Sequence, residues 1–334
     1  MSVVGLFDVL KVALTAPPPP AEHGDLIPPP RPIRSPRLSK TSTILTFQGA
    51  TYFCTGILIF LAPEIFNKMM FYPEPFLAVE TPIYRMLGFC IVAIGSFYIM
   101  ASRMDDMFFA IITIFTRMTM VPAFCLTLLF AYGGAPQLCL TFAILDPILA
   151  LWTYFTMKVE MKDPNLSLFK TLILAISGGE EGLIPDRSEL NETSKVLILQ
   201  GMVYSCTGLL MFFAPGIFNK IMFFPGPFTE EETPLYRSIG FSLVGIGYFY
   251  IMASRMNRIY WAVITIFNRM TMSPACCLIL LFVYGGAPQL CITFALLDPA
   301  LAIWTYSTLK TTKVPTSTTS YYPSVSRKVV VGGC

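Results

Sequence analysis

The sequence predicts an all-α, polytopic membrane protein whose eight transmembrane helices form two tandem four-helix bundles in parallel orientation. Three observations lead to this fold class. The chain has 334 residues, of which 54% are hydrophobic and only 13% are charged, whereas soluble domains carry about 25% charged residues. Apolar stretches of membrane-spanning length recur along the chain. The hydrophobic part also matches itself, without gaps, at a constant offset.

The self-match divides the chain into units. Gln48 is matched by Gln200 and Asp146 by Asp298, an offset of 152 residues in both cases (200 − 48 and 298 − 146). An internal repeat of this kind sets the architecture of a chain. We therefore expect a first four-helix transmembrane repeat at residues 41–158, a linker at 159–194 and a second repeat at 195–310.

Each unit contains four apolar stretches, and a membrane span needs about 20 apolar residues at 1.5 Å each. The spans predicted for the first unit are Ile44–Ala62, Ile83–Ser102, Phe108–Tyr132 and Pro136–Met157. Those predicted for the second unit are Val196–Ala214, Leu235–Ser254, Ile259–Tyr284 and Pro288–Leu309. An even number of spans gives both units the same orientation, related by an axis along the membrane normal.

Charged residues outside the spans indicate the topology. Four basic residues precede the first span with no acidic residue among them: Arg31, Arg34, Arg37 and Lys40. The positive-inside rule then places both tails and the linker in the cytoplasm. We expect the proline-rich, basic residues 1–40 and residues 311–334 to be disordered. Asn165 and Asn191 begin glycosylation patterns, but both lie on the linker, so we interpret them as chance matches.

Charges inside the spans are the strongest candidates for a functional site. Arg117 lies about nine residues past the start of its span, or roughly 14 Å deep. Asp146 lies about ten residues in from the other side, or roughly 15 Å deep, so both stand near the midplane. A charge there costs at least ~2.5–3.5 kcal/mol. Arg269 and Asp298 repeat the arrangement in the second unit.

Polar residues and helix breaks accompany these charges. Four polar residues share a helical face with the arginines by spacing: Thr113, Thr116, Thr265 and Asn268. Pro122 and Pro147 lie close to the charges, and each proline removes a backbone donor. Side chains lean toward the amino end of their own helix, so Arg117 and Asp146 should lean apart and leave a gap for water or a ligand group. A structural ion pair and a ligand, ion or proton site both remain open.

Two further pairs of polar residues lie toward the ends of the spans. Gln48 and Gln200, near the inner ends of the first spans, are expected to hydrogen-bond across helices. Arg85 and Arg237, near the outer ends of the second spans, are expected to snorkel to lipid headgroups.

The sequence argues against several classes of function. Its only histidine, His23, leaves no His-based zinc site, bis-His haem or Ser-His-Asp triad. Most cysteines lie in apolar runs and none forms a C-x-x-C motif, which favours a structural role. No basic patch is dense enough for nucleic acid. We predict no enzyme, no catalytic residue, no metal and no cofactor, since one Asp and one Arg per bundle make a thin catalytic set.

Two functional hypotheses remain. The first is a membrane protein that binds or transports a small solute or lipid at the midplane Arg–Asp sites. The alternative is a non-catalytic scaffold in the bilayer that recruits cytoplasmic partners through its proline-rich tail. Residues Pro29–Arg34 fit a P-x-x-P-x-R ligand of SH3-type grooves. Assembly into a homo-oligomer is left open.

Two short motifs connect each unit to a known family. Tyr84-Arg85-x-x-Gly88 opens the second span, and Leu145-Asp146-Pro147-x-Leu149-Ala150-x-Trp152-Thr153 lies in the fourth. Through these motifs the unit resembles the small four-helix membrane proteins called DoxX-like, here duplicated in tandem. The resemblance implies a fold and no particular reaction. The duplication and the long tails depart from the single-unit pattern of that group.

Overall fold

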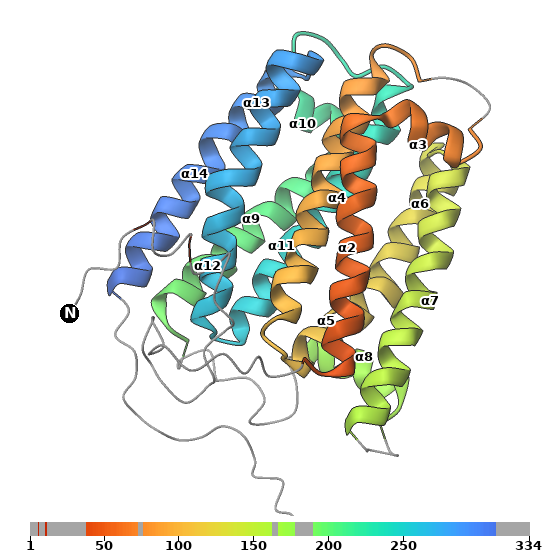
Figure 1. Ribbon diagram of the computed structural model, residues 1–334. Coiled ribbons are helices and arrows are strands. Elements are labelled where there is room, and N and C mark those ends of the chain that lie inside the picture. The colour runs from red at the N-terminus through yellow and green to blue at the C-terminus, as the bar shows by residue number, and fades with distance from the viewer. Residues whose placement is uncertain are drawn as a thin grey trace, which may run out of the picture.

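The computed structural model describes Leu6, Lys11 and residues 38–72, 76–161, 166–177 and 190–311. Within these residues the chain forms helices joined by short loops and contains no β-strand. The long helices stand side by side, with α3 and α10 at one end of the molecule and α8 near the other (Figure 1). The all-α fold class is therefore confirmed for the described residues.

The helices occur in two series. The first series is α2 (Lys40–Leu61), α3 (Pro63–Met69), α4 (Glu80–Ser102), α5 (Met107–Phe115), the π-helix η1 (Thr116–Met120), α6 (Val121–Tyr132) and α7 (Pro136–Met161). After α8 (Leu168–Ser177), the second series is α9 (Glu192–Phe213), α10 (Pro215–Ile221), α11 (Glu232–Arg255), α12 (Ile259–Phe267), the π-helix η3 (Asn268–Met272), α13 (Ser273–Tyr284) and α14 (Pro288–Thr311). Below, the first half means α2–α7 and the second half α9–α14.

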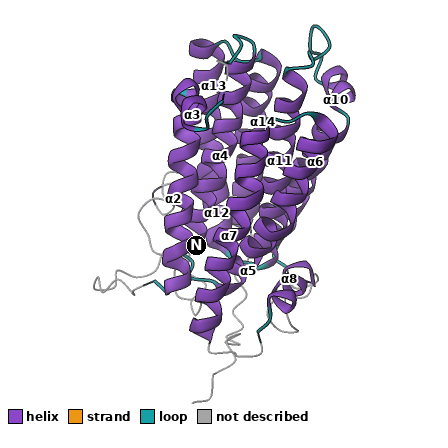
Figure 2. Cartoon of the chain, turned by 90° about the vertical axis from the view of Figure 1, so that its right-hand side faces the viewer, coloured by secondary structure: helices purple, strands orange, loops and turns teal. Residues whose placement is uncertain are grey.

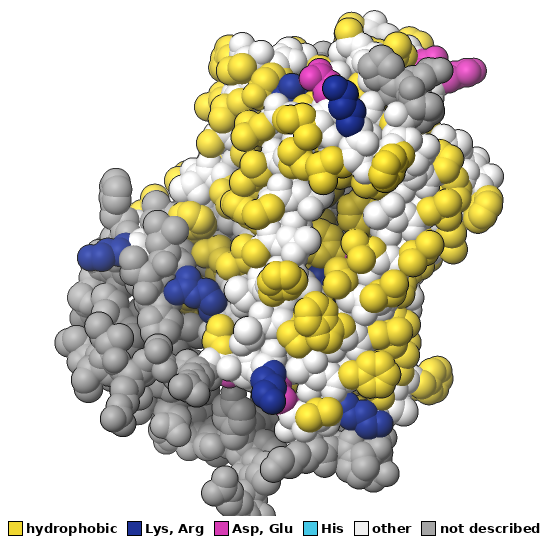
Figure 3. Space-filling view, turned by 45° about the vertical axis from the view of Figure 1, so that its right-hand side comes forward, with side chains coloured by type: hydrophobic (Ala, Val, Ile, Leu, Met, Phe, Trp, Pro, Cys, Tyr) yellow, Lys and Arg dark blue, Asp and Glu magenta, His cyan; other side chains and the backbone are white. Residues whose placement is uncertain are grey.

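Eight helices in the described part of the chain are long and apolar enough to cross a membrane. Two of them are composite, because α5, η1 and α6 run on as one helix, as do α12, η3 and α13. This confirms the eight predicted spans. In Figure 3, hydrophobic side chains cover the middle of the visible face, while the charged ones gather toward its two ends. Both features are compatible with a multi-pass membrane protein.

The helices α4 and α11 form the centre of the molecule. In their apolar segments 78% and 72% of the residues are buried, against 28–39% in α2, α7, α9 and α14. Figure 2 shows α4 and α11 between α2 and α6. Glycines let α2 approach α4 closely, because a Cβ on Gly56 would lie 2.5 Å from the Val92 backbone nitrogen. Gly208 meets Val244 in the same way at 2.7 Å. Small residues at such crossings allow close packing of membrane helices.

Side chains accept hydrogen bonds from the free backbone amides where α2 and α9 begin. Ser39 and Asn191 are the N-caps of α2 and α9, and Asn191 Oδ1 accepts a hydrogen bond from the Ser194 amide at 2.7 Å. Glu160 accepts from the Thr41 amide at 2.9 Å. Asn191 thus has a structural role in starting a helix. Asn165, the segment Pro29–Arg34 and most of both tails lie outside the described residues.

Two arginines join the halves through contacts that the sequence did not predict, and the expectation that they snorkel to headgroups stays a prediction. Arg85 Nη1 donates to the carbonyls of Phe60 (2.5 Å) and Leu61 (2.9 Å) at the end of α2. Its guanidinium carbon lies 3.7 Å from the centre of the Tyr284 ring on α13. Arg237 reaches Tyr132 on α6 at the same distance. Carbonyls left open at a helix end attract a cation, and the aromatic ring of the other half covers it.

Candidate functional site: a buried Arg–Asp level with a cavity

Arg117 is buried in the composite third span. It lies in η1, where the chain adopts one turn of π-helix just before Pro122. Single π-helical turns widen an α-helix locally and occur often at functional sites. The side chain of Arg117 is only 1% exposed. Its guanidinium carbon lies 4.4 Å from the centre of the Tyr98 ring and 5.1 Å from that of Tyr52, so two aromatic faces surround the cation.

Gln48 on α2 holds this guanidinium in place. Arg117 Nη1 donates to Gln48 Oε1, and the Thr153 hydroxyl donates to the same oxygen at 3.3 Å. Gln48 Nε2 donates to the Leu149 carbonyl on α7 at 3.2 Å. The prediction that Gln48 hydrogen-bonds across helices is confirmed. One buried amide therefore connects α2, η1 and α7.

Asp146 on α7 is bound by a different side chain. The carboxylate precedes Pro147 and is 3% exposed. Its Oδ1 accepts a hydrogen bond from the hydroxyl of Tyr52. Tyr52 follows Gln48 by four residues, so the two partners lie one turn apart on the same face of α2. Each buried charge thus rests on a neutral side chain of one helix.

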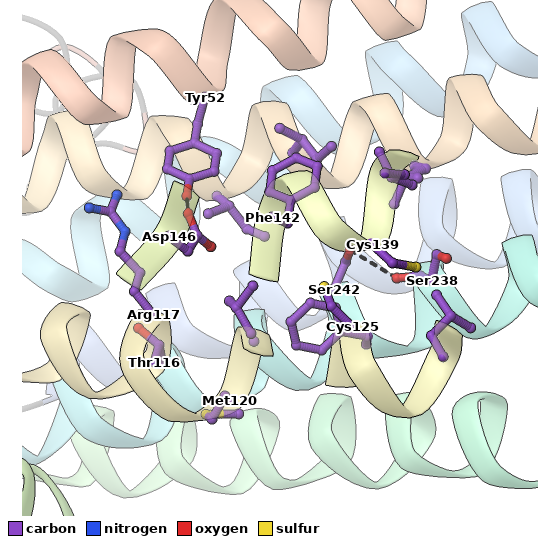
Figure 4. A pocket seen from close by; sticks show the side chains of 18 of the residues that line it. Tyr52, Thr116, Arg117, Met120, Cys125, Cys139, Phe142, Asp146, Ser238 and Ser242 are labelled. Atoms are coloured by element: carbon purple, nitrogen blue, oxygen red, sulfur yellow. Dashed lines mark hydrogen bonds between the residues drawn. The ribbon is translucent and has the colours of Figure 1, made fainter. Parts of the chain in front are cut away.

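The two charges share a site without direct contact. Among the described residues, neither Arg117 with Asp146 nor Arg269 with Asp298 forms an ion pair within 4.0 Å. Figure 4 shows the Tyr52 hydroxyl on the Asp146 carboxylate, with Arg117 beside them. The Nε and Nη2 atoms of Arg117 are buried and have no hydrogen-bond partner. The guanidinium therefore keeps two unused donors next to a carboxylate.

A cavity of about 110 Å³ adjoins both charges. Leu128, Leu138 and Phe142 give it an apolar wall, and α11 of the second half closes it. From α11 come Ser238 and Ser242, which also line the cavity and are labelled in Figure 4. The Ser242 hydroxyl donates to the Ser238 carbonyl at 3.1 Å. The site is thus formed by both halves.

The second half repeats the polar core of the site. Arg269 Nη1 donates to Gln200 Oε1, and the Tyr204 hydroxyl donates to Asp298 Oδ1. Arg269 also keeps Nε and Nη2 without a partner. The cavity beside this level is smaller, about 50 Å³. Both sites therefore have the same Arg, Gln, Tyr and Asp contacts, but their cavities differ in volume.

The four predicted supporting residues have unequal positions. Thr116 and Asn268 line the first and second cavity, respectively. The hydroxyls of Thr113 and Thr265 each donate to a carbonyl of their own helix at 2.8 Å. Thr116 also donates to carbonyls of its own helix, at 3.0 and 3.1 Å. Thr113 and Thr265 therefore support the local helix, whereas Thr116 and Asn268 face the cavities.

Sequence reasoning missed the residues that surround the charges. Tyr52 and Tyr98 carry no signal beyond their repetition as Tyr204 and Tyr250. The described residues contain no cluster of three or more His, Cys, Asp or Glu side chains that could hold a metal ion.

Comparisons of the chain with protein-family models, curated proteins and solved structures found no match. The resemblance to DoxX-like proteins therefore stays a prediction.

Proposed function

We propose that this is a multi-pass membrane protein that binds a small solute at the level of Arg117 and Asp146, between two tandem four-helix bundles that lie in the same orientation. Both tails and the linker are cytoplasmic in this arrangement, as the positive-inside rule predicts. Transport of the solute would use the same site. The observation that carries the proposal is the pair of unused Arg117 donors beside a cavity that Asp146 also lines.

The energetics favour a binding site over a lock between helices. A buried ion pair stabilises a protein only when its geometry is excellent and its remaining donors and acceptors are satisfied. Here the charges do not touch, and two donors of Arg117 remain open. An open buried donor costs about 1–3 kcal/mol. A solute that accepts hydrogen bonds from Arg117 would remove this cost, which favours its binding.

The size of the cavity limits the solute. An apolar cavity of about 150 Å³ accommodates benzene, and this one measures about 110 Å³. It suits a compact molecule or a single headgroup better than a whole lipid. The solute needs acceptor oxygens for Arg117 and an apolar part for Leu138 and Phe142.

Native mass spectrometry of the gently extracted full chain tests the proposal. We expect a small molecule to remain bound to the unmodified protein. Arg117→Lys combined with Arg269→Lys should release it, because lysine keeps the charge but lacks the planar fork of donors. Arg258→Lys is the matched control. Arg258 Nη2 lies 3.4 Å from Asp106 Oδ2, and neither residue lines the cavity. Absence of any bound molecule, together with equal behaviour of both variants in thermal-shift screens of small solutes, would contradict solute binding.

A further inference from the structure

The two cavities are lined by equivalent positions, and each wall nearest the molecular centre comes from the opposite half. Ser238, Ser242 and Gly245 of α11 line the first cavity. The residues 152 positions earlier, Met86, Cys90 and Ala93 of α4, line the second. The two phenylalanines that complete each wall are the same in both halves. The halves thus differ at three wall positions, and the first cavity has the smaller side chains.

Met86 divides the hollow of the second half. It lines the cavity of about 50 Å³ and also a separate one of about 10 Å³. The smaller cavity is bordered by Leu280, Leu290 and Cys291, whose equivalents in the first half line the single cavity of about 110 Å³. Ser238 stands where Met86 does and has one heavy atom beyond Cβ instead of three. The hollow is therefore continuous in the first half and interrupted in the second.

The charges of the site define the solute class. Nε–H and Nη2–H lie on one edge of the planar guanidinium, the edge that holds both oxygens of a carboxylate. With Asp146 ionised, Arg117 and Asp146 together are neutral, so a solute with a single charge would leave a net charge near the midplane. A zwitterion keeps the level neutral and gives each protein charge an opposite partner. Leu128, Leu138 and Phe142 then accommodate an apolar arm.

We propose that only the first cavity takes a solute, that this solute is a small zwitterion with a short apolar arm, and that Met86 closes the second cavity. An apolar α-amino acid has this chemistry, as a free molecule. The inference rests on the proposed function and adds the class of solute and the number of sites. Nε and Nη2 of Arg117 are covered, and an amino acid such as valine has more heavy atoms than the benzene that a cavity of about 150 Å³ holds. Neighbouring side chains must therefore move as the solute enters the cavity of about 110 Å³.

Calorimetric titration of the full chain in detergent with valine tests the solute class. We expect one valine per chain. 3-Methylbutanoate, which lacks the ammonium group, and 2-methylpropylamine, which lacks the carboxylate, should each bind about 10- to 100-fold more weakly, since each loses one charged contact. Equal affinity of valine and either analogue would overturn the zwitterion assignment.

Exchange of the wall residues tests the number of sites. Met86→Ser should raise the stoichiometry from one to two, whereas Met86→Leu, which keeps the volume, should leave it at one. Ser238→Met should abolish valine binding, and Ser238→Ala should preserve it. The thermal unfolding of the two Ser238 variants shows whether the methionine form is folded. Two valines bound to the unmodified chain, or one to Met86→Ser, would overturn the role of Met86.

The two proposals fail in distinguishable ways. A solute other than an amino acid, retained in native mass spectra and released by Arg117→Lys with Arg269→Lys, would overturn the zwitterion inference and leave solute binding intact. A native spectrum with no bound molecule, together with no binding of valine or its analogues, would overturn both. A phospholipid that is bound in place of a free solute and is released by the same double variant would overturn the assignment of a free amino acid.

Discussion

The first and the second Arg–Asp levels have the same charged core and differ in the wall where the halves meet. The Gln48 amide donates to Leu149 at 3.2 Å, and Gln200 donates to Leu301 at 3.2 Å. The contacts between the two halves, in contrast, are not equivalent. Phe124 on α6 packs against the Phe241 ring at 4.7 Å, whereas the equivalent position on α13 is Cys276. The two halves thus agree in the charged core and differ in the wall that the opposite half supplies.

This difference indicates how one fold can carry two unequal sites. The polar core fixes where a charge can be tolerated in the bilayer, so substitutions in it are costly in either half. The wall only sets the volume and the polarity of the cavity, and a change such as Met86 for Ser238 alters one site without touching the other. The largest expected effects should therefore be equal in the two halves, and the smaller ones should separate them.

Removal of the glutamine that holds each arginine should have the largest effect. Gln48→Leu leaves the Arg117 guanidinium without its hydrogen-bond acceptor, as Gln200→Leu does for Arg269. Loss of one partner of a buried charge costs about 3–5 kcal/mol in soluble proteins, and less where water reaches the charge. We expect a clear fall in thermal stability in detergent, of similar size in both halves.

A double-mutant cycle shows which contacts carry this energy. Arg117→Leu and Gln48→Leu should be strongly coupled, because their side chains touch. Asp146→Asn and Tyr52→Phe should be coupled for the same reason. Arg117 and Asp146 should couple more weakly with each other. Coupling that is strongest between Arg117 and Asp146 would mean that they pair directly and that no gap for a solute exists.

The sequence predicted the parts of the fold that depend on one segment at a time. Hydropathy and length located all eight long helices, and the positions of Pro63 and Pro136 marked two of the joints. The membrane cost of a charge identified Arg117 and Asp146 as the candidate site. These inferences needed no knowledge of how one helix packs on another.

Contacts between segments could not be predicted from the sequence in the same way. The π-helix at Arg117 offsets the helical phase by part of a turn, which redirects the side chain toward Gln48. Arg85 was expected at the headgroups because the sequence does not show that the carbonyl of Phe60 and the ring of Tyr284 lie beside it. One signal was available: Ser238 departs from the repeat at Met86, and such departures mark the wall of the cavity.

The glycine contacts should give an intermediate effect that is again equal in the halves. A methyl group on Gly56 would lie 2.5 Å from the backbone nitrogen of Val92, and one on Gly208 would lie 2.5 Å from the carbonyl oxygen of Gly240. Overpacking costs typically about 1–3 kcal/mol, and backbone atoms cannot move away as a side chain can. We expect Gly56→Ala and Gly208→Ala to lower the unfolding temperature to a similar degree.

Gly245→Ala is the matched control for these variants. A methyl group there meets no atom within 4 Å, because Gly245 borders the first cavity, and the equivalent position in α4 is already Ala93. Its unfolding temperature should equal that of the unmodified chain. A loss as large as that of Gly56→Ala would show that glycine in these helices serves flexibility and not close approach.

The smallest effect should separate the halves by sign. Asn268 is buried, and its amide nitrogen and oxygen both lack a hydrogen-bond partner, whereas Thr116, at the same position of the first half, donates to two carbonyls of its own helix. Asn268→Thr should therefore stabilise the protein by about 1 kcal/mol, since an unsatisfied buried polar group is replaced by a satisfied one. Thr116→Asn should destabilise it by a similar amount, because the two hydrogen bonds of the threonine hydroxyl would be lost and a buried amide would take its place. Chemical unfolding of both variants in one detergent measures the difference. A loss of stability in Asn268→Thr would show that water already satisfies this amide, and that the second cavity is a hydrated polar pocket instead of a strained one.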